Sequence, residues 1–161
     1  MSKLLKTLVL LGFVAACSPK LQPSPLTSQE VLQLVDDRTY QFNMEYVQPM
    51  GGRQRLITGS YTFRVNKDQL DADLPYIGRA YQAPIGTSDV GMKFTSKDFT
   101  YSSITGKSNR REISIHLNDQ QDIATINLII FENGNADLRI TSVNRQPISY
   151  TGNISRLPQP K

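Results

Sequence analysis

Between residues 40 and 154 the sequence alternates apolar with polar residues in short runs, and this alternation is the feature that most constrains the fold. A period of two puts the apolar side chains on one face of an extended strand and the polar ones on the other. Polar turns separate most runs. The pattern predicts a mainly β domain of about eight strands, an antiparallel meander forming a curled sheet, barrel-like or a sandwich. The runs are 40–46, 61–65, 70–74, 99–103, 113–117, 123–131, 136–140 and 148–154.

The last four runs carry further information on pairing. Residues 123–131 are apolar at nearly every position, which predicts a strand in the middle of the sheet. Asn133-Gly134 follows this run and predicts a two-residue hairpin turn, because both central positions of such a turn need a positive φ. The last four runs follow one another through short turns, so we expect them to pair in sequence order.

One short α-helix is expected before the first strand. Thr27 or Ser28 can cap its N-terminus, with Glu30 in the first turn, and residues 31–35 give it one apolar side. The helix should end near Asp37. Such a helix can plug one end of a barrel or cover an open sheet edge.

The N-terminus has the layout of a secretory signal. Lys3 and Lys6 precede an apolar run, 8–16, that is too short to span a bilayer as a stable anchor. The run ends in Val14-Ala15-Ala16-Cys17, which resembles a bacterial lipobox. This resemblance implies a signal peptide at residues 1–16, cleavage before Cys17, a lipid on the Cys17 thiol and an acyl chain such as palmitate on the new N-terminus.

The residues after the lipobox indicate where the anchor would hold the protein. Residues 17–26 predict a lipidated, extended tether rich in Ser and Pro, a single β-rich domain should occupy 27–156, and 157–161 form a tail. Ser18 stands where an aspartate would indicate retention in the inner membrane, and no acidic run follows. We therefore expect a protein of the cell envelope, anchored in the outer membrane and facing the periplasm.

Charge and cysteine content argue against several classes of function. Lys3 and Lys6 account for half of the net charge of +4, and the rest of the chain carries 16 basic and 14 acidic side chains. This near balance, without a basic stripe, gives no reason to expect a nucleic-acid partner. Cys17 is the only cysteine, so no intrachain disulfide or catalytic thiol is expected, and a single His argues against a histidine-rich metal site.

Asp71 and Asp73 are the candidates for acid–base chemistry. They lie two residues apart on one face of an expected strand, with Asp68 nearby, and paired carboxylates can bind a hard cation or act as acid and base. A polar strand face explains the same pattern. His116 falls at an outward strand position. The sequence has no nucleophile elbow, phosphate loop or zinc spacing, so it predicts no catalytic residue, cofactor or metal site.

The segment Asp71–Phe99 departs from the alternation, and we expect it to be irregular because Pro and Gly interrupt it repeatedly. It nevertheless carries several large apolar side chains. Tyr76, Arg79 and Tyr81 combine aromatic rings with a guanidinium that can stack on a ring or bind an anion. Arg145 lies in a second turn that could meet this one. These four residues form the candidate binding surface; alternatively, the same side chains simply close one end of the domain.

Four motifs occur in order: Pro49-Met50-Gly51-Gly52-Arg53, Leu74-Pro75-Tyr76-Ile77-Gly78-Arg79-Ala80-Tyr81, Gly91-Met92-Lys93-Phe94-Thr95-Ser96 and Asn144-Arg145-Gln146-Pro147-Ile148-Ser149. Together they resemble the small bacterial envelope lipoproteins of domain-of-unknown-function family 4251. The resemblance extends from about Leu32 to Ile154. It implies a secreted lipoprotein with a mostly β domain, and it brings no activity or catalytic residue with it.

The sequence therefore favours a lipid-anchored envelope protein that acts as a non-catalytic binding or structural module. It would present residues 74–94 to an envelope protein or a small ligand, and it would contact the membrane through the lipid on Cys17. Two alternatives stay open: an envelope hydrolase using Asp71 and Asp73, and a carrier that holds an apolar ligand in a barrel cavity.

Overall fold

The structure is a computed structural model that describes residues 25–81 and 91–159. In these residues the chain forms one α-helix, one 3-10 helix and ten strands. The mainly β class and the short N-terminal helix expected from the sequence are confirmed. The elements are α1 (Ser28–Asp36), β1 (Thr39–Pro49), β2 (Arg55–Leu56), β3 (Thr62–Asn66), β4 (Gln69–Leu74), β5 (Met92–Ser96), β6 (Phe99–Thr105), η1 (Lys107–Asn109), β7 (Arg111–Leu117), β8 (Ile123–Ile130), β9 (Asn135–Ser142) and β10 (Ile148–Arg156).

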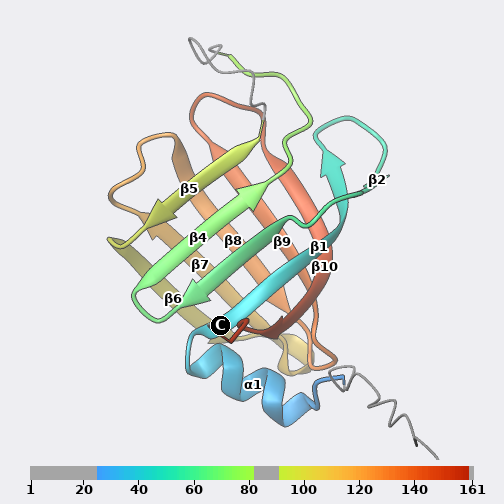
Figure 1. The fold of residues 1–161 in the computed structure, drawn as a ribbon, viewed down its shortest axis with the longest axis vertical. Coiled ribbons are helices and arrows are strands. Elements are labelled where there is room, and N and C mark those ends of the chain that lie inside the picture. The colour runs from blue at the N-terminus through green and yellow to red at the C-terminus, as the bar shows by residue number, and fades with distance from the viewer. Residues whose placement is uncertain (1–24, 82–90, 160–161) are drawn as a thin grey trace, which may run out of the picture.

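The strands form one antiparallel sheet that curls almost into a closed barrel (Figure 1). The sheet order is β5-β4-β3-β1-β10-β9-β8-β7-β6, and β2 pairs with β1 beside this path. β7 to β10 are neighbours in sequence order, as predicted. β8 lies inside the sheet but not at its middle, where we expected it. β1 and β10 occupy the middle, because the last strand returns to pair with the first.

Large apolar side chains fill the interior of the barrel. Along each strand, every second side chain points into the barrel. These inward side chains are mostly aromatic or branched. A carrier of an apolar ligand would need an unfilled interior. The interior of this barrel is filled, which argues against a carrier. The largest fully buried side chains are Tyr40, Phe42, Phe63, Leu70, Leu74, Ile115, Ile126, Leu128, Ile130, Leu138, Ile140 and Tyr150.

Helix α1 closes one end of the barrel, at the bottom of Figure 1. Thr27 is its N-cap. The Thr27 hydroxyl accepts a hydrogen bond from the Glu30 amide, and the Glu30 carboxylate accepts one from the Thr27 amide. The helix ends at its C-cap, Asp37, as predicted. Val31 and Val35 are 1% exposed, which confirms the apolar side of the helix. Of the two roles that the sequence left open, the helix plugs a barrel end.

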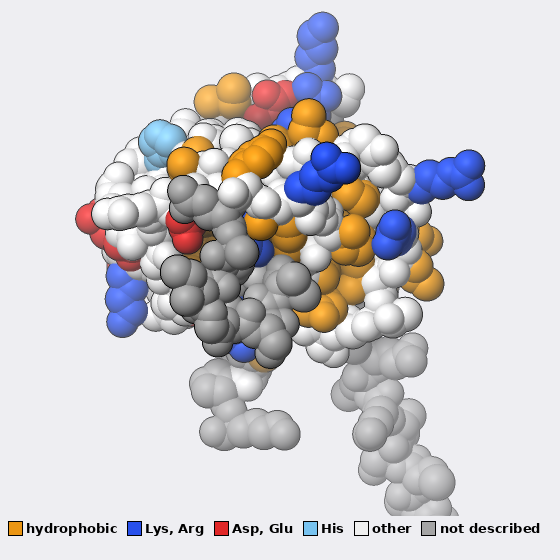
Figure 2. Space-filling view, turned by 90° about the horizontal axis from the view of Figure 1, so that it is seen from above, with side chains coloured by type: hydrophobic (Ala, Val, Ile, Leu, Met, Phe, Trp, Pro, Cys, Tyr) orange, Lys and Arg blue, Asp and Glu red, His pale blue; other side chains and the backbone are white. Residues whose placement is uncertain are grey.

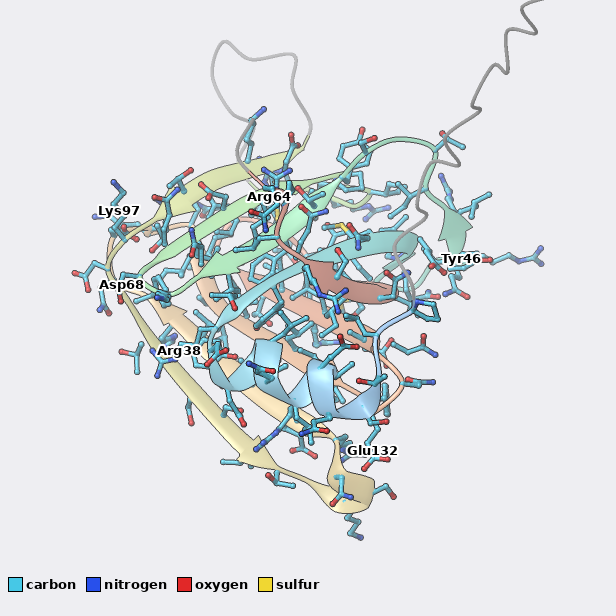
Figure 3. The ribbon with its side chains drawn as sticks, turned by 60° about the horizontal axis from the view of Figure 1, so that its bottom comes forward. Arg38, Tyr46, Arg64, Asp68, Lys97 and Glu132 are labelled. Carbon is cyan, nitrogen blue, oxygen red and sulfur yellow. The ribbon has the colours of Figure 1, made fainter. Side chains whose placement is uncertain are left out.

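Contacts from the α1–β1 junction attach this helix to the far edge of the sheet. Asp36 pairs with Arg111 of β7 at 3.1 Å. The Arg38 guanidinium lies 4.7 Å from the centre of the Tyr101 ring on β6, a cation–π arrangement. Figure 3 shows Arg38 at the C-terminal end of α1. The Tyr101 hydroxyl is in turn 3.2 Å from the buried Tyr40 hydroxyl. We call this part of the molecule the helix end.

The segment Asp71–Phe99 contains more strand than we expected, because β5 was not predicted, whereas the run at 70–74 was. β4 runs through its first residues and pairs with β5, from Leu70 opposite Ser96 to Leu74 opposite Met92. The alternation in β5 covers five residues between glycine and a turn, too few to stand out without knowledge of the pairing. β2 was not predicted for a related reason. Its two residues form a strand only because they pair with β1.

The turn between β8 and β9 differs from the predicted two-residue hairpin. The Phe131 amide donates to the Asn135 carbonyl, and the Gly134 amide donates to the Phe131 carbonyl, both at 2.9 Å. The loop therefore holds three residues. Gly134 has a φ of +83°, whereas Asn133 is not in the positive-φ region. A three-residue loop needs one left-handed residue, which glycine supplies without steric cost.

Gly152 on β10 lies opposite Met44 on β1, where the two strands approach closely. The register shifts between Met44 and Tyr46, which is a β-bulge. A Cβ atom at residue 152 would lie 2.0 Å from the Asn43 carbonyl oxygen. Because that atom belongs to the backbone of β1, only glycine fits here.

Candidate functional site

Two connections meet at the barrel end opposite α1, at the top of Figure 1. We call residues 75–81 the β4 loop and residues 143–147 the β9–β10 turn. Figure 2 views this end, where hydrophobic side chains gather beside lysine and arginine side chains. We call it the loop end.

Backbone hydrogen bonds join the two connections. The Tyr81 amide donates to the Asn144 carbonyl at 2.7 Å, and the Gln146 amide donates to the Arg79 carbonyl at 3.2 Å. An antiparallel bridge between Ala80 and the turn completes this short ladder. The contact between the two turns that the sequence left open is therefore real, and it rests on main-chain groups.

Tyr76 occupies the centre of this junction and is half-buried. Its hydroxyl donates to the Arg79 carbonyl at 2.9 Å. The Arg145 guanidinium lies 5.1 Å from the centre of the Tyr76 ring, a cation–π arrangement. Burial raises the pKa of the Tyr76 phenol. Tyr76 therefore stays neutral at neutral pH and acts as a platform on which Arg145 is oriented.

Tyr150 ties the β4 loop to the core. It stands on β10 and is buried, and its hydroxyl donates to the Pro75 carbonyl at 2.7 Å. Burial raises the pKa of this phenol well above its ordinary value. The loop thus starts from a fixed point on the rigid sheet, which is how binding loops are held in many β scaffolds.

A cavity of about 140 Å³ opens beside the junction. It lies between β5, the start of β8 and the end of β9. Met92 and Ile123 give it apolar surface, whereas side-chain amides and charges supply its polar groups. This mixture suits a small polar ligand or one extended side chain of a partner, since it offers donors and acceptors beside a few apolar atoms. The lining residues are Gly91, Met92, Lys93, Phe94, Gln120, Asp122, Ile123, Ser142, Asn144 and Arg145.

Polar contacts hold the cavity wall in place. Arg145 donates to the Gly91 carbonyl at 3.1 Å, so its guanidinium links the Tyr76 platform to the start of β5. Gln120 donates to the Thr95 carbonyl at 3.0 Å. Asn144 and Asp122 hydrogen-bond at 2.8 Å. The amide groups of this wall were not predicted as site residues, because a Gln or Asn in a polar turn carries no signal of its own.

The structure brings together two side chains of the predicted binding surface, those of Tyr76 and Arg145. Arg79 and Tyr81 join the same junction through their backbones. The Tyr81 side chain is 67% exposed. Cys17, the predicted lipidation site, lies outside the described residues. That these side chains bind a ligand or partner stays a prediction.

Asp71 and Asp73 point outward from β4 and have partners on neighbouring residues. Asp71 accepts hydrogen bonds from Thr95 at 2.7 Å and from Gln69 at 2.9 Å. Asp73 forms an ion pair with Lys93 at 3.3 Å. Together they border an open depression on the outer face of the sheet. Cross-strand partners account for the positions of both carboxylates without a catalytic role, and the hydrolase that the sequence left open stays untested.

Two further observations concern the described part of the chain. Within residues 25–81 and 91–159, no three His, Cys, Asp or Glu side chains gather in a way that could hold a metal ion. No helix in the same residues is long and apolar enough to cross a membrane.

Comparison with known proteins gives a family and a fold. No curated protein matches the chain. A solved crystal structure of a DUF4251 family protein from Bacteroides eggerthii is similar, with a TM-score of 0.59 and 13% sequence identity, over 80% of this chain and 87% of that one. At this identity the likeness concerns the fold. The model of the family described as "Domain of unknown function (DUF4251)" matches residues 25–154. The chain therefore belongs to the DUF4251 family.

Proposed function

We propose that this protein is a lipid-anchored module of the cell envelope that binds an envelope protein or a small ligand at its loop end, without catalysing a reaction. The observation that carries the proposal is the junction of the β4 loop with the β9–β10 turn. There Arg145 is held between Tyr76 and Gly91 beside a cavity of about 140 Å³.

The distribution of buried side chains supports binding at the surface and not inside the barrel. The interior is filled by large side chains, so a ligand finds room at the rim. At the rim, an aromatic ring and a guanidinium combine apolar contact with directional hydrogen bonding, and such residues dominate many binding interfaces. The exposed Tyr81 extends this surface outward.

A photoreactive residue at position 81 tests the binding proposal. It is introduced in the full chain in cells, with the same residue at Leu56 as control, because the two positions are 67% and 65% exposed but belong to different segments, the β4 loop and β2. We expect a specific adduct from position 81 that is lost when Arg145→Ala is added. Equal adducts from both positions, or none from position 81, would contradict the proposal.

The anchoring proposal rests on Val14-Ala15-Ala16-Cys17, which resembles a lipobox. Two or more acyl chains hold a protein at a membrane firmly, because each buried methylene contributes ~0.8 kcal/mol. Cells fed an alkyne fatty acid should label the protein, and Cys17→Ser should abolish the label while Ser18→Ala keeps it. A Cys17→Ser protein that still takes up label would exclude this anchor.

Membrane fractionation tests the predicted location. We propose an outer-membrane anchor with the domain in the periplasm, since Ser18 is not an aspartate and no acidic run follows Cys17. The protein should fractionate with the outer membrane, and Ser18→Asp should move it to the inner membrane. A protein found in the inner membrane without this change would refute the placement.

A further inference from the structure

The main strand order of the sheet ends in two edge strands, β5 and β6, and they differ in how they are protected. β5 forms one edge. It is five residues long, carries Lys93, and receives a hydrogen bond from Gln120 on the Thr95 carbonyl. A short strand, a lysine and a covering side chain are the devices by which native sheets avoid pairing with other chains.

β6 forms the other edge, and it is longer and carries neither a lysine nor a proline, although Arg38 stacks on its Tyr101 ring. It is seven residues long, Phe99-Thr100-Tyr101-Ser102-Ser103-Ile104-Thr105, with no charge and no proline. β7 pairs with every one of its residues along one side. Residues 102–105 are exposed on both faces of the strand, and Ile104 is 59% exposed. A long, uncharged strand of this kind is a template for another strand.

We propose that β6 pairs antiparallel with β6 of a second copy of this chain, around a twofold axis at Ser102. A twofold axis perpendicular to the sheet keeps inward residues opposite inward ones and outward residues opposite outward ones. All seven residues of β6 then pair. The two Ser102 side chains meet at the axis, and no charges oppose one another within the strand.

The two halves of β6 complement each other in this register. Phe99 and Tyr101 are half-buried and face inward, and they fall opposite Thr105 and Ser103, which are exposed. On the outer face, Ile104 falls opposite Thr100. Aromatic and β-branched cross-strand pairs of this kind stabilise antiparallel sheets. The exposed half of each strand is thus covered by the partly buried half of its partner, which explains why a second copy fits better than an arbitrary peptide.

The ends of the paired strands bring charged residues of the two copies near each other. In this register Asp98 of one copy lies opposite Gly106 of the other. Lys107 follows Gly106, so the negative Asp98 lies near the positive Lys107 of the other copy. Lys97 is a like charge to Lys107, but both lie beyond the seven paired residues. Figure 3 shows Lys97 at the corner where β6 begins, on the periphery of the molecule. The edge is therefore accessible at this corner.

Cysteine cross-linking of the full chain tests the register. Ser102→Cys places a thiol at the axis, and Ser114→Cys serves as a control, because Ser114 is the exposed neighbour of Ser102 on β7. The unsubstituted chain, with Cys17 alone, gives the baseline. We expect Ser102→Cys to form more disulfide-linked dimer than either Ser114→Cys or the unsubstituted chain. Equal dimer from the two variants, or a link from Ser102→Cys to a different polypeptide, would overturn the proposal.

Sedimentation of the full chain in detergent tests the interface independently. Ile104→Lys puts a charge on the edge, and Val143→Lys is its control, since Val143 is 60% exposed at the loop end. We expect Ile104→Lys to weaken the dimer at least ~10-fold in Kd and Val143→Lys to leave it unchanged. A chain that stays monomeric without substitution, or a dimer that resists Ile104→Lys, would also overturn it.

Discussion

The two ends of the barrel are closed in different ways. At the helix end, α1 covers the opening with buried valines, and an ion pair and two tyrosine hydroxyls lie at its border. At the loop end, main-chain hydrogen bonds join two connections and leave side chains such as Tyr81 exposed. Buried side chains close the helix end, whereas at the loop end main-chain hydrogen bonds act together with contacts from Tyr76, Arg145 and Tyr150. Side chains outside these contacts, such as Tyr81, stay exposed at the loop end and available to a partner.

The largest effect should come from shortening a valine at each end. Val35→Ala removes buried methyl groups under α1 and should lower the free energy of unfolding by about 2 kcal/mol. Val143→Ala, the same change at an exposed position of the loop end, should stay within about 0.5 kcal/mol. Urea denaturation followed by circular dichroism measures both. Equal losses in the free energy of unfolding would show that the two ends contribute equally to stability.

Removing a buried hydroxyl at each end should have the next largest effect. Tyr40→Phe breaks the contact with Tyr101, and Tyr150→Phe breaks the hydrogen bond to the Pro75 carbonyl. Each should cost about 1–2 kcal/mol, because a half-buried partner loses its hydrogen bond. Hydrogen exchange separates them: Tyr150→Phe should speed exchange in residues 76–81, and Tyr40→Phe should not. Unchanged exchange in the β4 loop would contradict the role given to Tyr150.

The two cation–π pairs provide a sharper test with a smaller effect on stability. Arg38 stacks on Tyr101 at the helix end, and Arg145 stacks on Tyr76 at the loop end. Arg38→Met and Arg145→Met should each cost about 0.5–1 kcal/mol. Arg145→Met alone should reduce the photo-adduct from position 81. An equal reduction with Arg38→Met would mean that the adduct reports stability and not binding.

The smallest effect should be the response of the helix end to acid. Hydrogen bonds from Thr27, together with Arg156, hold the pKa of Glu30 below its ordinary value of 4.5. A lowered pKa gives stability that is present above 4.5 and is lost as the pH falls through the folded-state value. Glu30→Gln should therefore flatten the fall in thermal midpoint below pH 4.5. A fall of the same steepness in the variant would exclude this contribution.

Sequence alone predicted the parts of this fold that depend on local patterns. The alternation of apolar and polar residues predicted most strands, and Thr27 or Ser28 before an apolar-sided run predicted the helix, because strand faces and helix caps are set by residues close in the chain. The four candidate surface residues were also found in this way. Aromatic and basic residues in a Pro- and Gly-interrupted stretch are unusual enough to be noticed without a structure.

The remaining features depend on contacts between distant residues. The strand character of β5 comes from β4, the return of β10 beside β1 sets the middle of the sheet, and Gly152 is required only because the Asn43 carbonyl lies against it. The position of Arg145 over Tyr76 is of the same kind. Local sequence determined which residues alternate, turn and cap; the tertiary structure decided which of them meet, because pairing free energy arises only when separate segments come together.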